Sequence, residues 1–219
     1  MERSDNTKII DLLKGAESIA IVPSKVAGKD AFAAGVGLFH ALKAQYSDSD
    51  ISLIYPGELP EDSTGLIDEE NIVSEIDERE LVLALDYSET PAAKIKYDNS
   101  TAGLLYLHLT PVNKKFDVKK NVRVGMKGFD FDVVITIGAQ VLRDLGRTYS
   151  ELQLEFFKAK IINIDTTDMN HRFGAVNVVD PSMDSLSLLV LNSLPTWDLN
   201  VTTKAAKALL EGVSHNTLS

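Results

Sequence analysis

The sequence contains no cysteine, which removes several kinds of site at once. Without thiols the chain cannot form a disulfide framework, a thiolate zinc site, an iron–sulfur cluster or a cysteine nucleophile. No apolar stretch approaches the roughly 18 residues of a membrane-spanning helix. The polar first five residues lack the charged–apolar–small pattern of a secretory leader. These absences predict a soluble, cytoplasmic protein with no membrane partner.

Positive charge is also scarce, because 22 Lys and Arg face 32 Asp and Glu, which gives a net charge of −10 over 219 residues. Such a chain repels polyphosphate backbones unless it has a local basic groove or bound cations. The clearest basic cluster, at 114–120, lies in a predicted loop and is interpreted as solvated surface. The length suits one domain with a sizeable core and an inserted lobe.

Apolar runs alternate with helical patterns over most of the chain. We expect strands at 17–23, 51–56, 80–88, 131–139 and 160–165. We expect helices at 5–15, 28–45, 139–146, 149–159, 182–194 and 199–213, and a weak helix or a loop at 62–77. Strands that alternate with helices predict a doubly wound, mostly parallel α/β sheet with helices on both faces. The apolar run at 80–88 is typical of a strand covered on both sides.

The pattern changes at about 87–127, which we interpret as an inserted β-hairpin region. Two apolar stretches flank the polar turn at 98–100, as in a hairpin, and 122–128 adds a third short strand. Because an unpaired sheet edge invites pairing, the strands at 93–109 predict a homodimer.

Polar residues follow several of the predicted strands. In parallel α/β sheets, binding and catalysis collect at the carboxyl ends of the strands. The first strand leads to Ser24, Lys25, Gly28, Lys29 and Asp30, the strand at 80–88 to Asp86, the strand at 131–139 to Gly138, and the strand at 160–165 to Asp165. This edge of the sheet is therefore the candidate site.

The segment 163–181 resembles the signature of the DHH family of phosphoesterases, which includes oligoribonucleases, cyclic-dinucleotide phosphodiesterases and exopolyphosphatases. Ten positions match in type and spacing: Asn163, Ile164, Asp165, Asn170, Phe173, Gly174, Asn177, Val179, Asp180 and Pro181. Residues 21–42, 131–146 and 205–217 resemble other parts of the family in the same order. The resemblance implies a DHH-type α/β domain over 1–219, and we expect the family's C-terminal substrate-binding domain to be absent from this chain.

The resemblance also implies two divalent cations, usually manganese or magnesium, which activate water and neutralise phosphoryl charge. Such ions require carboxylates and imidazoles. Two acids remain at the family's ligand positions, Asp30 and Asp165, and the other positions carry Ser24, Gly28, Gly138, Thr166, Thr167 and Asn216. We therefore expect a degenerate homologue without metal-dependent hydrolysis and without a cofactor. It would act as a binding or interaction module in which Asp30 and Asp165 bind metal weakly, or cap backbone N–H groups.

Two alternatives remain open at the level of sequence. One is an active phosphoesterase on oligonucleotides, cyclic dinucleotides or polyphosphate, with manganese or magnesium in a site rebuilt from acids and a histidine: Asp30, Asp86, Asp165, Asp168 and His171. The other is a metal-free binder of a nucleotide or short oligonucleotide, with Lys25 and Lys29 as phosphate-binding charges. His40, His108 and His215 are interpreted as packing or surface residues, although His215 lies near enough to Asn216 to reach the site.

Overall fold

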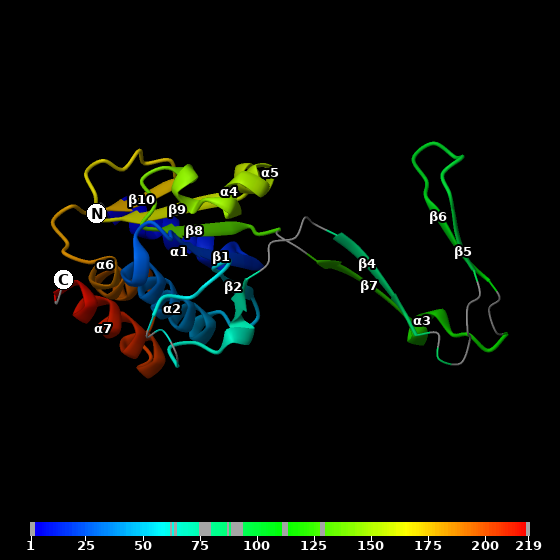
Figure 1. Cartoon of the computed structure of the whole chain (residues 1–219), viewed down its shortest axis with the longest axis horizontal. Coiled ribbons are helices and arrows are strands. Elements are labelled where there is room, and N and C mark those ends of the chain that lie inside the picture. The colour runs from blue at the N-terminus through cyan, green and yellow to red at the C-terminus, as the bar shows by residue number, and fades with distance from the viewer. Residues whose placement is uncertain are drawn as a thin grey trace. The chain divides into compact units, whose positions relative to one another are not determined.

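The computed structural model describes residues 3–61, 63, 65–74, 80–86, 88, 94–110, 114–127 and 130–217. The chain divides into two compact units (Figure 1). One, here called the body, contains residues 1–76 and 129–219. The other, here called the insertion unit, contains residues 77–128.

The body is built on a six-stranded sheet in the order β10-β9-β8-β1-β2-β3, and every neighbouring pair is parallel. The strands are β1 (Ser18–Pro23), β2 (Asp50–Ile54), β3 (Ile72–Val73), β8 (Val133–Ile137), β9 (Lys160–Asp165) and β10 (Val176–Val179). The predicted α/β fold is therefore confirmed.

Helices cover both faces of this sheet because successive strand residues alternate between two apolar clusters. Ile19 and Ile21 of β1 belong to the larger cluster, whereas Ala20 and Val22 belong to the smaller one. The larger cluster includes residues of α1 (Arg3–Gly15), α2 (Gly28–Gln45), α6 (Leu186–Ser193) and α7 (Thr203–Thr217), and of the 3-10 helix Leu194–Trp197. The smaller includes residues of the 3-10 helix Leu142–Leu145 and of α5 (Gln153–Lys158), with α4 (Arg147–Glu151) packed beside it.

The connections from β1 to β2 and from β8 to β9 cross opposite faces, and β2 and β8 lie on opposite sides of β1. The carboxyl ends of β1 and β8 therefore form the topological switch point, where parallel sheets open a crevice.

One predicted strand was placed in the wrong sheet. Residues 80–88 were expected to form a strand of the parallel sheet covered on both faces. Instead β4 (Glu80–Leu85) pairs antiparallel with β7 (Val122–Lys127) in the insertion unit, and Leu81 is 62% exposed. An apolar run does not by itself show whether a second layer covers it. The third strand beside β1 and β2 is β3, in the segment predicted as a weak helix or loop, where a 3-10 helix (Glu69–Asn71) precedes it.

Other elements differ in detail. The short strand β10 was not predicted, and the helix expected at 149–159 is divided into α4 and α5 at the buried Leu152. The predicted hairpin is confirmed as β5 (Lys94–Asp98) and β6 (Tyr106–Thr110), which pair antiparallel. The short helix α3 (Val118–Asn121) precedes β7. No helix among the described residues combines the length and hydrophobicity needed to cross a membrane.

Small residues let α2 pack closely against its neighbours. A Cβ atom added at Gly35 would lie 2.6 Å from Pro23 Cγ of β1, and one added at Gly37 would overlap the side chain of Leu209 on α7. The side chain of Leu209 therefore packs directly against the backbone at Gly37, and this contact holds α7 close to α2.

We expect Gly37→Ala to destabilise the body by about 1–3 kcal/mol, because a methyl group there overpacks a closed contact. Gly15→Ala is the matched control, since Gly15 is also helical but has no atom within 4 Å of an added Cβ. Its stability should stay within about 1 kcal/mol of wild type. Urea unfolding of both variants measures the difference, and equal stabilities would contradict the packing described.

Candidate functional site

Several of the polar residues predicted from sequence lie around the switch point. Ser24 follows β1, Gly138 follows β8 and Asp165 ends β9. Two backbone bonds extend the sheet here, from Ser24 N to Ile137 O (2.8 Å) and from Gly138 N to Ile164 O (2.8 Å). The amino ends of α2 and α6 complete the surroundings, because Asp30 of α2 bonds to the first residues of α6.

Asp30 caps helix α6. Its carboxylate accepts a hydrogen bond from Leu186 N (Oδ2, 2.7 Å) and one from Ser187 N (Oδ1, 3.0 Å), and Ser187 Oγ donates to Asp30 O (3.2 Å). Asp30 is only 5% exposed. A carboxylate at a helix N-terminus satisfies free N–H groups and interacts favourably with the helix dipole. Both oxygens of this retained acid therefore have a structural role.

Gly138 lies in a space with no room for a side chain. Its φ of +72° is in the left-handed region. A Cβ atom added there would lie 2.6 Å from Ala27 Cβ, 2.8 Å from Leu186 Cδ1 and 3.3 Å from Ala31 Cβ. Apolar atoms thus occupy the volume into which a ligand side chain at this position would project.

The loop before α2 is held by its own contacts. The buried hydroxyl of Ser24 donates to Asp144 O (3.1 Å) and accepts from Val26 N (3.3 Å). Gly28, at a φ of +66°, donates its N–H to Lys25 O (3.1 Å). The amides of Val26 and Gly28 are therefore engaged within the chain.

The two loop lysines have different surroundings. Lys29 Nζ lies 2.9 Å from Glu211 Oε1 of α7, and the Lys29 side chain is 14% exposed. Lys25 is exposed, and its Nζ lies 5.2 Å from the centroid of the Tyr55 ring, at cation–π range. Tyr55 is itself buried, and this burial raises the pKa of its hydroxyl. Lys29 is thus neutralised by an acid, whereas Lys25 keeps an accessible charge.

A chain of buried amides organises the signature segment. Asn163 Nδ2 donates to Asn170 Oδ1 (2.8 Å) and to Asn177 Oδ1 (3.4 Å), and Thr136 Oγ1 donates to Asn163 Oδ1 (3.1 Å). Asn177 bonds Gly174 through both its amide atoms. A Cβ added at Gly174 would lie 2.6 Å from Val176 O, so a glycine is needed beside the strand.

Asp165 is tied into the same network. Its Oδ1 accepts from Thr166 N (2.8 Å) and its Oδ2 from Asn170 Nδ2 (2.7 Å), while Asn170 also donates to Ala139 O (2.8 Å). Asp165 and Asn170 are buried. Asn170 therefore joins the end of β9 to the turn after β8, and the carboxylate of Asp165 is one of its supports.

The remaining predicted residues do not converge on this point. Thr167 Oγ1 accepts from Met169 N (3.2 Å), and Asp168 is exposed. Thr166, at the end of β9, is only partly buried. Asn216 and His215 belong to α7, but their side chains are outside the described part of the chain.

The other candidate ligands lie elsewhere. Asp86 lies in the insertion unit, where the hydroxyl and then the N–H of Ser88 hold the pKa of its carboxyl below the usual value. Glu89 and Thr90, the polar residues that follow Asp86 and Ser88 in the sequence, fall outside the described residues. His171 is exposed beside Phe173 and Tyr149. His40 contacts Leu66 O through Nε2 (2.9 Å), and His108 stacks on Tyr106.

These residues do not fit a pair of divalent cations. Within the ranges that the structure describes, no group of three or more His, Cys, Asp or Glu is placed to hold a metal ion. Asp30 and Asp165 each use both oxygens in bonds to N–H groups, and Ser24 and Thr167 are engaged with the backbone. The donor set lacks the convergent carboxylates and imidazoles that such ions require.

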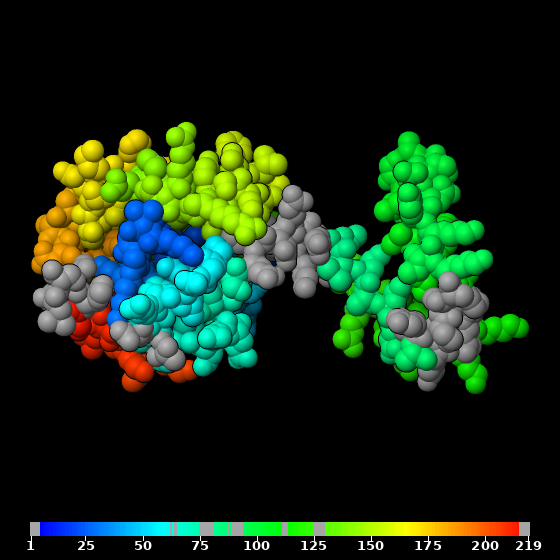
Figure 2. Space-filling view, in the orientation of Figure 1, coloured from blue at the N-terminus to red at the C-terminus, as the bar shows by residue number. Residues whose placement is uncertain are grey.

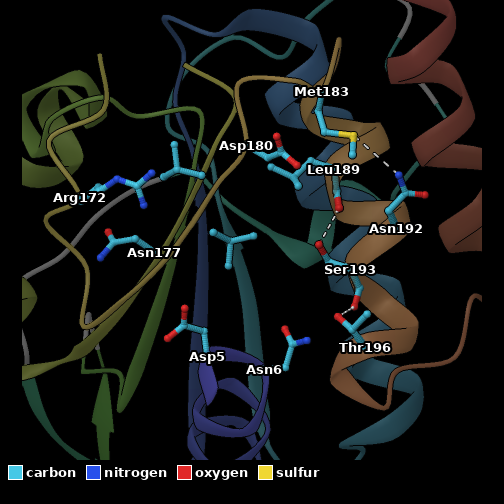
Figure 3. Close-up of a pocket in the computed structure, with 12 residues that line it drawn as sticks. Asp5, Asn6, Arg172, Asn177, Asp180, Met183, Leu189, Asn192, Ser193 and Thr196 are labelled. Carbon is cyan, nitrogen blue, oxygen red and sulfur yellow. Dashed lines mark hydrogen bonds between the residues drawn. The ribbon is translucent and has the colours of Figure 1, made fainter. Parts of the chain in front are cut away.

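A separate pocket of about 740 Å³ lies beside the edge strand β10 (Figure 3). Arg172 and Asn177 line one side of it, Met183 and Asn192 the other, and Asn6 of α1 the base. Arg172 has a left-handed φ of 50°. Sequence reasoning missed this pocket, because its residues come from three segments and only those of the signature segment belong to a recognised motif.

Two polar groups of this pocket differ in their bonding. Asp180 accepts from the hydroxyl (2.6 Å) and the N–H (3.0 Å) of Ser182, which hold the pKa of its carboxyl below the usual value. Asn6 Oδ1 is buried and has no hydrogen-bond partner among the described residues. The pocket is thus polar at its rim, but it holds none of the family's ligand positions.

Comparison with known proteins supports the fold and not a particular activity. No protein-family profile and no curated protein sequence matches the chain. A crystal structure of an exopolyphosphatase-related protein from Bacteroides fragilis matches 99% of this chain with a TM-score of 0.64 and 16% sequence identity. The match covers 51% of that protein, so this chain spans about half its length. This likeness supports an α/β fold that the two proteins share.

We expect Gly138→Ala to be more destabilising than Gly28→Ala. Both positions require a left-handed backbone, which costs a non-glycine residue about 1–2 kcal/mol. An added Cβ at Gly28 meets no atom within 4 Å, whereas one at Gly138 meets three apolar atoms. Overpacking should add about 1–3 kcal/mol at Gly138 alone. Denaturant unfolding measures both, and equal losses would mean that the space at Gly138 is not closed.

Asp30→Ala should lower the free energy of unfolding by about 2–4 kcal/mol, because two buried N–H groups of α6 lose their acceptor. The loss should be the same with a chelator and with 1 mM Mn²⁺. Asp168→Ala, which removes an exposed acid from the signature segment, is the matched control and should change stability by less than about 0.5 kcal/mol. An Asp30→Ala effect that appears only with Mn²⁺ would indicate a metal ligand instead.

Proposed function

We propose that the chain is a DHH-type phosphoesterase-like domain that does not hydrolyse phosphodiesters with divalent metal ions and acts as a binding or interaction module. The observation that carries this proposal is the closure of the space at Gly138 by Ala27, Ala31 and Leu186. In the family resemblance this position supplies a metal-binding aspartate. Here an added side chain has no space, and the neighbouring acid Asp30 is bound to α6.

The retained residues support the same proposal. Asn163, Asn170 and Asn177 bond to one another and to the backbone, so they stabilise the segment independently of any metal. Thr166 and Thr167 stand where the family has imidazoles, and neutral hydroxyls are weak ligands for such ions. Loss of even one supporting group of a metal site commonly lowers affinity or activity by about 10–100-fold. The loss of most ligands therefore removes the catalytic centre.

Two partner classes follow from the sequence, a nucleotide and a second copy of the chain. The contacts of the loop before α2 favour the second. Lys29 is paired with Glu211, and the N–H groups of Val26 and Gly28 are engaged within the chain, which leaves Lys25 as the accessible phosphate-binding charge of the pair. By contrast, the insertion unit exposes large apolar side chains. An interaction with protein is therefore better supported than phosphate binding.

Thermal unfolding with and without Mn²⁺ tests the proposal. A site with a Kd of about 10 µM would stabilise the protein by about 2.7 kcal/mol at 1 mM Mn²⁺, which corresponds to a Tm increase of roughly 5–11 °C. We expect wild type and Asp165→Asn to show the same small change. Asparagine keeps an acceptor for Thr166 N but places an NH2 group against Asn170 Nδ2, so the variant has a lower Tm of its own and only the change in Tm on adding Mn²⁺ is compared.

The matching activity measurement uses bis(4-nitrophenyl) phosphate, short oligonucleotides, cyclic dinucleotides and polyphosphate with Mn²⁺ or Mg²⁺. We expect wild type and Asp165→Asn to give equal background rates. Hydrolysis that wild type shows and Asp165→Asn loses would establish the active phosphoesterase instead. Saturable heat on calorimetric titration with mono- or dinucleotides in the presence of a chelator would establish the metal-free nucleotide binder.

A further inference from the structure

The pocket beside β10 has the size of a small-molecule site and carries charges of both signs. Its volume of about 740 Å³ falls within the range of about 300–1,000 Å³ that is typical of ligand pockets. Arg172 and Asp180 line its upper part in Figure 3, and Asp5 and Asn6 of α1 lie at its base. These residues all belong to the body, so the pocket does not depend on the insertion unit. A ligand here would meet a cation and acids at separate places.

Arg172 is the cation of this pocket. Its φ of 50° is unfavourable for a residue with a side chain, and its N–H donates to Oδ1 of the buried Asn170 (2.7 Å), which holds the backbone in this conformation. Strained positions of this kind cluster at functional sites. The segment that follows β9 lies at the surface of the body, in yellow in Figure 2. Within the described ranges the exposed guanidinium of Arg172 makes no hydrogen bond or ion pair, so it is available to an anionic group.

Three other polar side chains of the pocket present acceptors. Asp180 bonds Ser182 through Oδ1, and its Oδ2 makes no hydrogen bond within the described part of the chain. Asp5 Oδ1 lies 3.6 Å from Lys8 Nζ, and because this pair is open to water it interacts only weakly. Asn6 Oδ1 is unpaired, and since the terminal torsion of asparagine is broad, a small rotation of the amide presents this oxygen to the pocket that Asn6 lines. A ligand with N–H donors would satisfy these oxygens.

The wall between these polar groups is apolar and firmly held. Val178 and Val179 of β10 line it together with Met183 and with Leu189 of α6. Val178 and Leu189 belong to the larger apolar cluster, so a strand and a helix fix their positions. Ser193 Oγ, beside them, donates to Leu189 O (2.7 Å), so this hydroxyl too offers lone pairs and not its proton. The wall therefore suits an apolar side chain that carries a donor at one end.

The charges oppose the polyanions that the family resemblance implies as substrates. One arginine lines the pocket with two aspartates, on a chain whose net charge is −10. A phosphate group bound at Arg172 would lie in the field of Asp5 and Asp180. A single carboxylate, by contrast, can pair with a guanidinium through two parallel bonds. An ammonium group supplies three donors for the carboxylate and amide oxygens.

We propose that this pocket binds a small zwitterion, an α-amino acid or a dipeptide with an apolar side chain. Its carboxylate bonds the guanidinium of Arg172. Its ammonium group lies among the oxygens of Asp180, Asp5 and Asn6, and its side chain packs on the wall formed by β10 and α6. The volume leaves room for a second residue. The inference goes beyond the proposed function, because it assigns a ligand to a pocket that holds none of the family's metal-binding positions.

Calorimetric titration of the full-length chain with L-leucine and L-leucyl-L-leucine tests the ligand class. We expect saturable binding of at least one of the two. N-acetyl-L-leucine, which lacks the ammonium group, and L-leucinamide, which lacks the carboxylate, should each bind at least about 10-fold more weakly than L-leucine, because each leaves a charged group of the pocket unpaired. The single tryptophan, Trp197, is buried directly after Thr196, which lines the pocket, so its fluorescence gives a second readout.

Matched substitutions test how the ligand lies. Arg172→Gln should weaken zwitterion binding at least about 10-fold and remove the preference for L-leucine over L-leucinamide, because the carboxylate loses its partner. Arg143→Gln is the control, since Arg143 is also exposed but does not line the pocket, and should change affinity less than about twofold. Asp180→Asn, which keeps an acceptor for Ser182, should remove the preference over N-acetyl-L-leucine. Circular dichroism checks the fold, and Arg172→Lys, which lacks the planar fork, replaces Arg172→Gln if that variant unfolds.

Three outcomes would overturn the inference. One is the absence of saturable binding for every common α-amino acid and for L-leucyl-L-leucine up to about 10 mM, which is weaker than a useful affinity. Another is binding that Arg172→Gln and Arg143→Gln change equally. The third is adenosine monophosphate that displaces the zwitterion and binds more tightly, which would indicate a nucleotide site. All titrations contain a chelator, so failure here leaves the proposal about hydrolysis untouched, and Mn²⁺-dependent hydrolysis would overturn that proposal without changing these affinities.

Discussion

The carboxylate of Asp30 fixes the amino end of α6 against α2, and the rest of the site depends on this contact. Charged hydrogen bonds to N–H groups are the stronger kind, and here they are buried. They bring Leu186 beside Gly138, where no side chain then fits. Gly212 of α7 also packs on Ser187 and Asp30, and Glu211 pairs with Lys29. One acid thus joins three helices above the ends of the strands.

In the signature segment, the residues that stabilise the backbone conformation differ from those at the positions where a ligand would bind. An amide has both a donor and an acceptor, so Asn163 and Asn170 can each bond in several directions at once. Replacing either would leave buried groups unpaired. Thr167 makes one bond within its own turn. The bonds of the asparagines therefore hold the conformation of the segment without a contribution from a bound ligand.

Sequence patterns predicted the body well, because strands such as β1 and β9 are apolar on both faces and α2 has a clear beginning and end. They also predicted that Asp30, Gly138 and Asp165 lie near the carboxyl ends of the strands, and the structure places them there. What they could not supply was the direction of each bond: whether Asp30 faced a metal or a helix depended on Leu186, 156 residues away. The strand β4 was misplaced for a related reason. Its leucines are as apolar as those of a buried strand, and only its partner β7 shows that one face stays uncovered.

The body and the insertion unit differ in how much of their apolar surface they bury. In the body, each strand of the sheet has helices on its faces, so burial of apolar surface and pairing of the backbone are achieved within the chain. In the insertion unit, backbone pairing is achieved by two ribbons, but burial is not, since Ile95, Tyr97 and Leu81 remain largely exposed. Free energy from apolar burial is proportional to the area removed from water, so these ribbons gain most from a partner surface. At the switch point, the hydrogen bonds of the polar side chains are made within the chain. The insertion unit, by contrast, leaves much of its apolar surface exposed to water. The insertion unit, and not the end of the sheet at the switch point, therefore carries large apolar side chains that the described part of the chain leaves exposed.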